Sequence, residues 1–308
     1  MANTPGIIFF EAITPVHMGA GSSLSHIDLP IQRNQVTGLP IFQSSGVKGA
    51  LRAWTRETCQ GDSDKEKLIQ IFGPEPGGDD NQDDRAGLLG ITDAELLLFP
   101  VASEPGVFSF VTCPMILNEF IRKINAAGLI LNAGQDAFED LPEIQENKAL
   151  ISSRFNQQKS RLWLLDLPFE TDRTYVSKLD KLASLFSDLF FSPDDPMRTK
   201  ISKNIILIDD DVFSDLTAQA TEVRNRIKID YETGTVQQGA LWTEELLPIH
   251  SIMYSLSFFN SRNNGLTPDE IYDFFSTLNL HVCVNQMGGD QTLGHGLVKT
   301  AWHIRTLN

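Results

Sequence analysis

Asp28 is the residue near the start of the chain that is best suited to acid–base or metal chemistry. It follows a glycine-spaced loop, Gly19 to Ser23, and precedes Leu29-Pro30. A carboxylate in such a loop can act as a general base or can hold a divalent cation. A loop aspartate more often caps the turn that follows it, and for Asp28 this structural role stays open.

The segment from Ser44 to Arg56 adds cations to this region. Its pattern predicts a helix with Ser44 or Ser45 as the N-cap, and Lys48 and Arg52, four residues apart, share one face near the helix start. Free amides and the positive end of the helix dipole attract anions. We therefore expect a phosphate-binding site at this helix start.

A second glycine-rich segment, Gln286 to Gly296, lies between two expected strands near the end of the chain. It has neither the GK[ST] ending of a P-loop nor the GxGxxG spacing of a dinucleotide-binding turn. Successive backbone amides in such loops bind anions. Together with the first glycine loop, this segment is expected to line a phosphate track.

Residues 224–242 have the pattern of a β-hairpin. Polar and apolar residues alternate from Arg224 to Tyr231, and Thr233-Gly234-Thr235 forms the expected turn. A hairpin with cations such as Arg226 on one face and Trp242 nearby is suited to grip phosphate and to wedge against bases. An exposed hairpin with charged edge residues is the simpler alternative.

The other elements mix strands and helices and predict an α+β fold with a ferredoxin-like core. Strands are expected at residues 7–13, 90–101, 107–111, 162–167, 205–208, 249–259, 280–284 and 297–304. Further helices are expected at residues 116–127, 177–191 and 268–278, the last with Thr267 as its N-cap and Pro268 at its first position.

Three other groups of carboxylates are interpreted as structural. The run from Gly73 to Asp84 has no hydrophobic period and misses the spacing of a calcium-binding loop, so it is expected to be a surface loop. Asp93, at the start of a strand, is expected to be structural. Asp209 to Asp211 favour a helix N-terminus over a metal site.

Composition limits the class of protein. The 308 residues are 41% apolar and 21% charged, which is typical of a globular protein with a sizeable core. The sequence has no apolar run long enough for a transmembrane helix, and its first residues lack the basic flank and the small-residue cleavage site of a signal peptide, so secretion is not expected. Cys59, Cys113 and Cys283 form no CxxC pair, which argues against a thiolate zinc site and fits a reduced cytoplasm.

The net charge of -15 argues against simple binding of nucleic acid, which usually needs a basic surface. The acidic residues concentrate between Asp62 and Glu95, however. Because local charge decides binding more than the total does, a modest basic face near the first helix is still expected.

Taken together, these motifs resemble the RAMP superfamily, and within it the repeated backbone subunit of the Cmr (type III-B) CRISPR RNA-guided effector complex. The resemblance spans nearly the whole chain. The matching segments are Thr14, Val16 to Gly19, Gly21 to Ser23, Asp28 to Arg33, Thr37 to Pro40, Ser44-Ser45, Lys48 to Arg52, Asp93-Ala94, Phe99 to Val101, Gly106, Val111 to Pro114, Arg226 to Asp230, Thr233 to Val236, Gly239 to Trp242, Glu244-Glu245, Leu247-Pro248 and Gln286 to Gly296.

The resemblance implies a ferredoxin-like, RRM-like core that carries a thumb hairpin and lid insertions. A single elaborated domain would span residues 1–308, with its core at about 7–127 and 249–304. The insertions would occupy about 128–248, including a thumb region at about 222–248 that lies across paired RNA and kinks it.

The resemblance also implies that the chain binds guide RNA and cleaves the paired target RNA at regular intervals, as a divalent-metal-dependent endoribonuclease. Asp28 would be catalytic, either as the general base or as an orienting ligand of a Mg²⁺ or Mn²⁺ ion that binds only with RNA in place. The RNA-binding residues would be His17, Gly19, Gly21, Arg33, Ser45, Lys48, Arg52, Arg226, Gly288, Gly289 and Gly294.

The implied partners are guide RNA, target RNA, further copies of the chain in a helical filament and the other subunits of the Cmr complex. The implied location is the cytoplasm, with no membrane contact. Two alternatives stay open: a non-catalytic RNA-binding scaffold, and a metal-independent, guide-processing endonuclease that uses His17 or His26. Chelation of metal would abolish the metal-dependent cleavage by Asp28 and spare the histidine-based cleavage.

Overall fold

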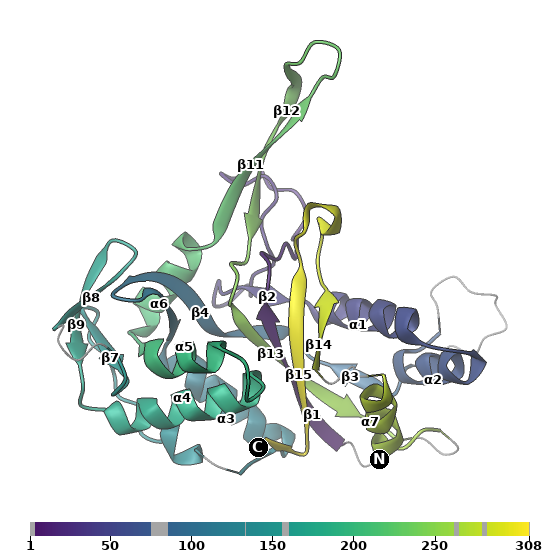
Figure 1. The fold of residues 1–308 in the computed structure, drawn as a ribbon, viewed down its shortest axis with the longest axis horizontal. Helices are drawn as coiled ribbons and strands as arrows, with labels where there is room; N and C mark the ends of the chain where they lie inside the picture. The colour runs from purple at the N-terminus through teal and green to yellow at the C-terminus, as the bar shows by residue number, and fades with distance from the viewer. Residues whose placement is uncertain are drawn as a thin grey trace.

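The computed structural model describes residues 4–74, 86–132, 134–155, 160–261, 265–278 and 282–307. It confirms a mixed α+β fold (Figure 1). The strands are β1 Thr4–Ala12, β2 Ile41–Phe42, β3 Leu89–Ile91, β4 Ala94–Glu104, β5 Val107–Thr112, β6 Ile130–Leu131, β7 Lys148–Ile151, β8 Arg161–Leu164, β9 Leu167–Asp172, β10 Ile205–Leu207, β11 Glu222–Ile229, β12 Val236–Leu246, β13 Ile252–Phe259, β14 Val282–Gln286, β15 Leu297–Ile304 and β16 Thr306–Leu307.

The helices are α1 Ser44–Thr58, α2 Asp62–Phe72, α3 Pro114–Ala127, α4 Val176–Phe190, α5 Met197–Asn204, α6 Asp210–Gln219 and α7 Pro268–Thr277. Two 3₁₀ turns, Gln135–Ala137 and Gln291–Leu293, complete the description. No helix in the described ranges is long and apolar enough to cross a membrane.

One large sheet runs through the molecule in the order β14-β15-β1-β13-β4-β5-β10-β7-β9-β8. Strand β1 is the third strand from the β14 edge and pairs antiparallel with both β13 and β15. The apolar run from Ile7 to Phe10 is fully buried because both faces of this strand are covered. The ring of Phe9, for example, packs 4.7 Å from that of Phe190 on α4.

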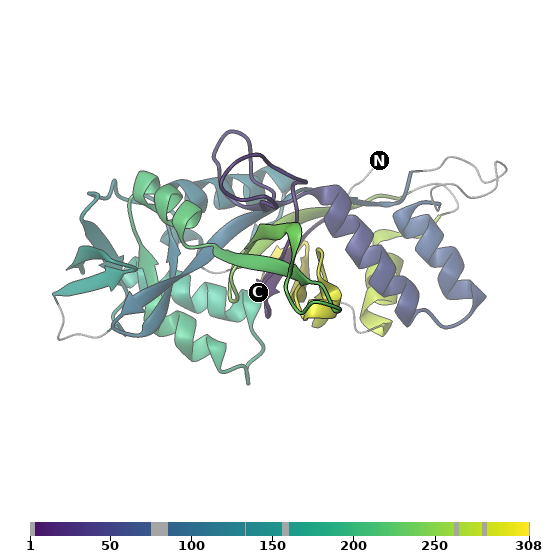
Figure 2. The same ribbon diagram turned by 90° about the horizontal axis from the view of Figure 1, so that it is seen from above.

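Helices cover the two ends of this sheet differently (Figures 1 and 2). Helices α1, α2 and α7 lie at one end, where Phe72 of α2 packs against Phe275 of α7 at 6.1 Å and Phe275 packs against Trp302 of β15 at 4.9 Å. Helices α3, α4 and α5 lie at the other end, around a cluster of phenylalanine rings that includes Phe120 and Phe186. The site described below lies above the centre of the sheet.

The hairpin of β11 and β12, called the thumb below, projects from the body (Figure 1). Its two strands form a sheet of their own, joined by the turn predicted around Thr233 to Thr235. Asp230 stabilises that turn by accepting hydrogen bonds from the amides of Glu232 and Thr233. An isolated two-stranded hairpin is only marginally stable in water. The base of the thumb must therefore be held by the body.

Most predicted elements are confirmed, including the Thr267 N-cap of α7, which in addition forms a capping box with Glu270, and the Asp209 cap of α6. The N-cap prediction for the first helix is wrong, because Gln43 is the N-cap and makes no side-chain capping bond. The segment predicted as one strand at 162–167 forms β8 and β9 around a tight turn, with Leu165 at φ 55°. Helices α2 and α5 were not predicted.

Two predicted segments lie partly outside the described residues. The expected acidic surface loop at 73–84 is described only at Gly73 and Pro74. The strand expected at 280–284 is described from Val282, where β14 begins.

Candidate functional site

Asp28 is exposed at the base of the thumb, where it is held by Thr243 of β12. Its Oδ2 accepts hydrogen bonds from the Thr243 amide at 2.7 Å and from the Thr243 hydroxyl at 2.9 Å. The Asp28 amide in turn donates to Thr243 Oγ1 at 2.9 Å. These hydrogen bonds lower the pKa of Asp28 below its usual value of 3.8, because they favour the ionised carboxylate.

The loop that carries Asp28 runs along β12 as an additional partner strand. The Leu29 amide donates to the Thr243 carbonyl at 3.0 Å, and the Glu245 amide donates to the Leu29 carbonyl at 3.0 Å. Val16 forms a second bridge, with two backbone bonds to Leu247. The position of Asp28 is therefore set by the backbone of the thumb strand.

Glu245 anchors this loop through a buried carboxylate. The side chain is 2% exposed and accepts hydrogen bonds from Arg33 Nη2 at 2.6 Å, from the Thr221 hydroxyl at 2.8 Å and from the Ile31 amide at 3.0 Å. Arg33 also donates to the Gly38 carbonyl at 2.9 Å. Burial of a charge is costly unless it is paired in this way.

Glu244 anchors the opposite face of β12, because successive side chains of a strand point to opposite faces. It is 3% exposed and forms an ion pair with Arg226 at 2.9 Å. Burial raises the pKa of Glu244, and the neighbouring carboxyl of Asp290 raises it further. The hydrogen bond with Glu244 lowers the pKa of Asp290.

His295 completes this second cluster. Its Nε2 lies 2.9 Å from Arg224 Nη1, and burial together with the two arginines lowers the pKa of its imidazole, so the ring is neutral and accepts from Arg224. The cluster thus joins the thumb, through Arg224, Arg226 and Glu244, to the C-terminal glycine loop, through Asp290 and His295.

Glu244, Asp290 and His295 offer ligand atoms within 4.8 Å of one another, which is compatible with a metal site. Two of the three already contact guanidinium groups, Glu244 that of Arg226 and His295 that of Arg224. A cation there would have to displace or lie beside these arginines, and repulsion opposes this. The cluster is better suited to fastening the thumb than to binding metal.

The two glycine loops lie against each other. The Gly289 amide donates to the His17 carbonyl at 2.9 Å, and a Cβ on Gly288, whose φ is +80°, would lie 2.3 Å from that carbonyl oxygen. His17 Nδ1 lies 2.8 Å from the Glu245 carbonyl oxygen. Gly288 is thus required by loop packing. Gly21 and Gly294 both border open space. The Gly294 amide donates to the Gln291 carbonyl at 3.0 Å, so of these two amides that of Gly21 is the better candidate for the predicted phosphate track.

The predicted phosphate site at the start of α1 is partly filled by the chain itself. The Ser44 amide donates to the Asp93 carboxylate at 2.8 Å, and the Gln43 amide donates to the Gln32 side chain at 2.8 Å. Asp93 therefore has the structural role that was predicted for it. The Asp93 carboxylate supplies the negative charge that the positive end of the helix dipole attracts, so a phosphate is less strongly attracted there.

Ser45, Lys48 and Arg52 do share one surface, as predicted, and together with Arg56 and Phe72 they line a hollow of about 500 Å³. Lys48 Nζ donates to the Leu89 carbonyl at 2.8 Å, and burial lowers its pKa. Arg52 Nη1 donates to the Pro74 carbonyl at 3.0 Å, whereas its Nη2 is without a hydrogen-bond partner among the described residues. That nitrogen is buried, so Arg52 would bind an RNA phosphate only if its guanidinium group turned outward.

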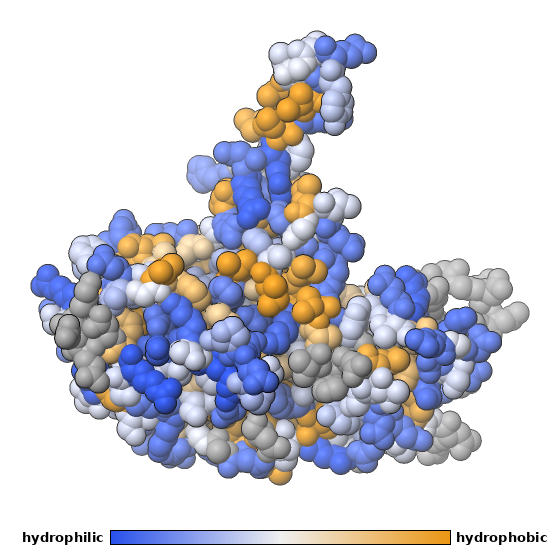
Figure 3. All heavy atoms as spheres, in the orientation of Figure 1, coloured by the Kyte–Doolittle hydropathy of each residue, from blue (hydrophilic) through white to orange (hydrophobic). Residues whose placement is uncertain are grey.

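The two faces of the thumb differ in character. Cross-strand pairing puts Ile227 beside Leu241 and Asn225 beside Thr243, so Thr243 lies on the apolar face. Ile227 and Leu241 are 51% and 64% exposed, and apolar side chains are visible on the projecting hairpin (Figure 3). The opposite face carries Arg226 beside Trp242, as the sequence predicted.

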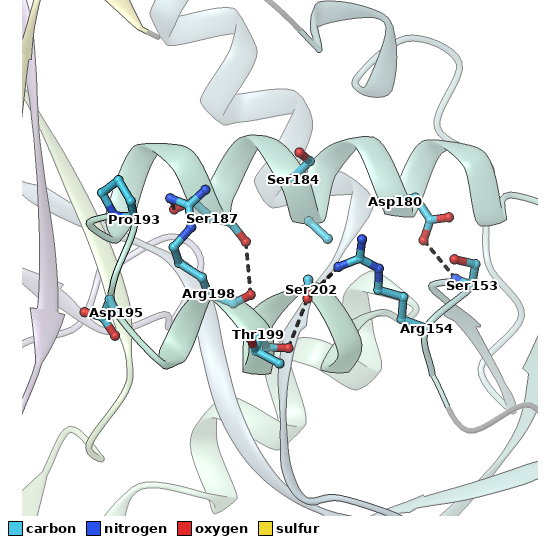
Figure 4. Close-up of a pocket in the computed structure, with 11 residues that line it drawn as sticks. Ser153, Arg154, Asp180, Ser184, Ser187, Pro193, Asp195, Arg198, Thr199 and Ser202 are labelled. Carbon is cyan, nitrogen blue, oxygen red and sulfur yellow. Dashed lines mark hydrogen bonds between the residues drawn. The ribbon is translucent and has the colours of Figure 1, made fainter.

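Another hollow, of about 450 Å³, lies between α4 and α5 (Figure 4). Arg154, Arg198, Asp180 and Asp195 line it. Arg198 donates to the carbonyls of Ser187 and Phe191, and Asp195 pairs with Lys299 at 2.6 Å. Because these charges have partners within the chain, the hollow is interpreted as a polar packing defect between the helices.

Comparison with known proteins identifies the family of the chain. The model of the RAMP superfamily matches residues 9–299. The chain belongs to the RAMP superfamily. It is 34% identical over 295 residues to the CRISPR system Cmr endoribonuclease Cmr4 of Pyrococcus furiosus, covering 95% of this chain and 94% of that protein.

Two solved structures extend the similarity to the fold of the whole chain. The crystal structure of oligomeric Cmr4 from Pyrococcus furiosus matches with a TM-score of 0.73 at 26% identity, covering 98% of this chain and 99% of that one. A chain in the cryo-EM structure of the type III-B Cmr-beta complex bound to cognate target RNA matches with a TM-score of 0.74 at 20% identity, covering 97% and 96%. The predicted family is thus confirmed.

Sequence reasoning missed the roles of Thr243, Glu244 and Glu245. Two adjacent acids in an apolar strand, Trp242 to Leu247, are unusual. Strand alternation would have put them on opposite faces, each in need of a cation. The contact between Thr243 and Asp28 joins residues 215 positions apart, and no local pattern reveals it.

Glu245→Ala is expected to lower the free energy of unfolding by about 3 kcal/mol, because it leaves Arg33 and the Ile31 amide without their buried acceptor. Urea unfolding of the isolated chain measures this. Glu232→Ala, at the exposed tip of the thumb, is the control and should change stability by less than about 0.5 kcal/mol. Equal effects of the two substitutions would show that Glu245 does not anchor the loop.

Proposed function

We propose that this chain is a guide-RNA-binding backbone subunit of a type III-B CRISPR effector complex and that it cleaves the paired target RNA at regular intervals. One observation carries the proposal: the exposed carboxylate of Asp28 is fixed at the base of the projecting thumb, on its apolar face. The relative named Cmr endoribonuclease Cmr4 supports both the complex and the reaction.

The thumb explains how a nucleotide of the target would come to Asp28. Ile227 and Leu241 expose apolar surface directly along the strands from Thr243. Apolar and aromatic side chains stack against bases that have left a helix. A thumb inserted into the guide–target duplex would unstack one target nucleotide and direct its backbone toward the thumb base.

Asp28 would then orient the attacking group. The target's 2'-hydroxyl donates a hydrogen bond to Asp28, its oxygen forms a bond to the adjacent phosphorus, and the bond from phosphorus to the 5' oxygen breaks. The 2' oxygen releases its proton to water, and the departing 5' oxygen takes up a proton from water. The products are a 2',3'-cyclic phosphate and a 5'-hydroxyl. Because its pKa is lowered, Asp28 is a weak proton acceptor at neutral pH, so orientation is its main contribution.

A divalent cation fits this site only when RNA is present. Magnesium and manganese are bound by one or two carboxylates together with substrate phosphates, and Asp28 is one exposed, ionised carboxylate. Bound between Asp28 and RNA, the cation would neutralise phosphate charge and make the 2'-hydroxyl more acidic.

Guide RNA would follow the surface from the α1 hollow to the glycine loops. Arg52 lines that hollow, Gly21 presents open backbone, and Gly294 borders open space although its amide donates to the Gln291 carbonyl at 3.0 Å. His17, Gly19, Arg33, Ser45, Lys48, Arg226, Gly288 and Gly289 stay predicted RNA-binding residues, although His17, Arg33, Lys48, Arg226 and Gly289 also bind other parts of the chain.

Assembly into a filament of several copies, together with other Cmr subunits and in the cytoplasm, completes the proposal. The oligomeric relative supports self-association. Heterologous contacts between identical subunits generate such filaments. The strand order β15-β1-β13-β4, with α1 and α7 in the connections, supports a ferredoxin-like core with residues 128–248 as insertions.

Asp28→Asn is expected to abolish the regularly spaced cuts in target RNA while RNA affinity stays within about twofold of the native value. The substitution keeps the size of the side chain and removes its charge. The measurement is target cleavage by the assembled complex with Mg²⁺ or Mn²⁺, alongside a binding titration and analysis of the product ends.

Undiminished cutting by this variant would support the scaffold alternative. Cleavage that survives chelation of metal but depends on His17 or His26 would support the histidine-based alternative. Asp93→Asn is the matched control, because Asp93 is exposed and its carboxylate accepts a hydrogen bond from the Ser44 amide at the start of α1.

Arg52→Gln is expected to weaken binding of guide RNA and to reduce the slope of log affinity against log salt by about one, the effect of one lost phosphate contact. Fluorescence titration at several salt concentrations measures both. Arg122→Gln, an exposed arginine paired with Glu119 on α3, should leave the slope unchanged. A native slope for Arg52→Gln would remove α1 from the guide-binding surface.

A further inference from the structure

We propose that Thr243 is the positioning residue for RNA cleavage: its amide and hydroxyl hold one oxygen of Asp28 so that the other oxygen faces the target RNA. This inference rests on the proposed catalytic role of Asp28. It adds a second residue, on a different element, that the reaction would require.

The contact between the two residues is reciprocal. Thr243 donates twice to Oδ2 of Asp28, at 2.7 and 2.9 Å, and accepts once from the Asp28 amide at 2.9 Å. The hydroxyl also lies 3.4 Å from the His26 carbonyl, a longer contact than the one to Asp28. A hydroxyl can donate and accept at once, and Thr243 uses both capacities toward Asp28.

Two donors on one carboxylate oxygen fix the orientation of an otherwise mobile side chain. Asp28 is exposed, so packing does not select its rotamer. The second oxygen, Oδ1, receives no hydrogen bond from another residue of the described ranges. Thr243 therefore leaves one oxygen of fixed direction for the RNA, which is the preorganisation that a reactive group needs.

Thr243 also links Asp28 to the thumb itself. It lies on β12 between Trp242 and the buried Glu244, and it pairs with Asn225 across the hairpin. The apolar pair Ile227 and Leu241 follows on the same face. Strand β12 thus sets the distance between the apolar side chains of the thumb, which would displace a nucleotide, and the Asp28 carboxylate, which would act on it.

No charged side chain contributes to the lowered pKa of Asp28, which comes from Thr243 and from its own amide. Removal of the Thr243 hydroxyl would therefore leave Asp28 ionised at neutral pH. We therefore expect the Asp28 carboxylate to lose its fixed orientation and to keep its charge.

Thr243→Val removes the hydroxyl and keeps the shape and β-branching of the side chain. One of the two donors to Oδ2 is lost and the Asp28 amide loses its acceptor, while the Thr243 backbone donor stays. Single-turnover cleavage by the assembled complex is expected to slow about tenfold, the rate equivalent of one hydrogen bond. Target affinity and the thermal unfolding midpoint of the chain should stay native.

Thr243→Ser keeps the hydroxyl and is expected to restore cleavage to within about twofold of the native rate. Thr277→Val, which removes an exposed hydroxyl at the end of α7, is the matched control and should cleave normally. If Thr243→Val fails to fold, the comparison of Thr243→Ser with Thr243→Ala carries the same test.

Native cleavage by Thr243→Val, or a loss of target affinity equal to its loss of rate, would overturn the positioning role. Failure of Thr243→Ser to recover the rate would overturn it as well. Asp28→Asn, measured in parallel, separates the two proposals. If that variant cleaves normally, the proposed function itself fails, whereas an inactive Asp28→Asn with a fully active Thr243→Val refutes only the role of Thr243.

Discussion

Two neighbouring buried carboxylates, Glu244 and Glu245, hold the projecting thumb to the body of the molecule. Because they are adjacent in one strand, they face opposite ways. Glu245 binds Arg33 and the loop that carries Asp28, and Glu244 binds Arg226 beside the C-terminal glycine loop. Breaking either pair would leave an uncompensated charge in the interior, which is among the costlier defects in a protein.

This arrangement explains how a two-stranded hairpin, which would be only marginally stable by itself, is held rigidly on the body of the molecule. Both glycine loops are fastened at its base. The first is held by the bridges of Val16 to Leu247, just after β12, and of Leu29 to Glu244, and the second is held through Asp290 and His295. Asp28, the proposed catalytic residue, is held on the same strand by its hydrogen bonds with Thr243. The spacing between the apolar thumb face and the carboxylate is therefore a property of the fold.

Sequence patterns predicted what depends on local order. The buried run of β1, the hairpin turn at Thr233 to Thr235 and the N-cap at Thr267 each follow from a few neighbouring residues. The partners of the arginine side chains could not be predicted from such local patterns. Arg33 and Arg226 were expected to bind RNA. The charge of Arg33 is paired with Glu245, 212 positions away in sequence, and that of Arg226 is paired with Glu244, 18 positions away. Their roles toward RNA stay predictions, as does that of Asp28.

A structure of the assembled complex with guide RNA and a target carrying 2'-deoxy nucleotides at the cut positions tests the central claim most directly. Such a target cannot form the 2'-oxygen bond and stays intact. The account predicts an unstacked target nucleotide against Ile227 and Leu241, with the phosphate that would be cut beside Asp28. A target strand that stays stacked past the thumb, or a scissile phosphate lying over the α1 hollow away from Asp28, would contradict it.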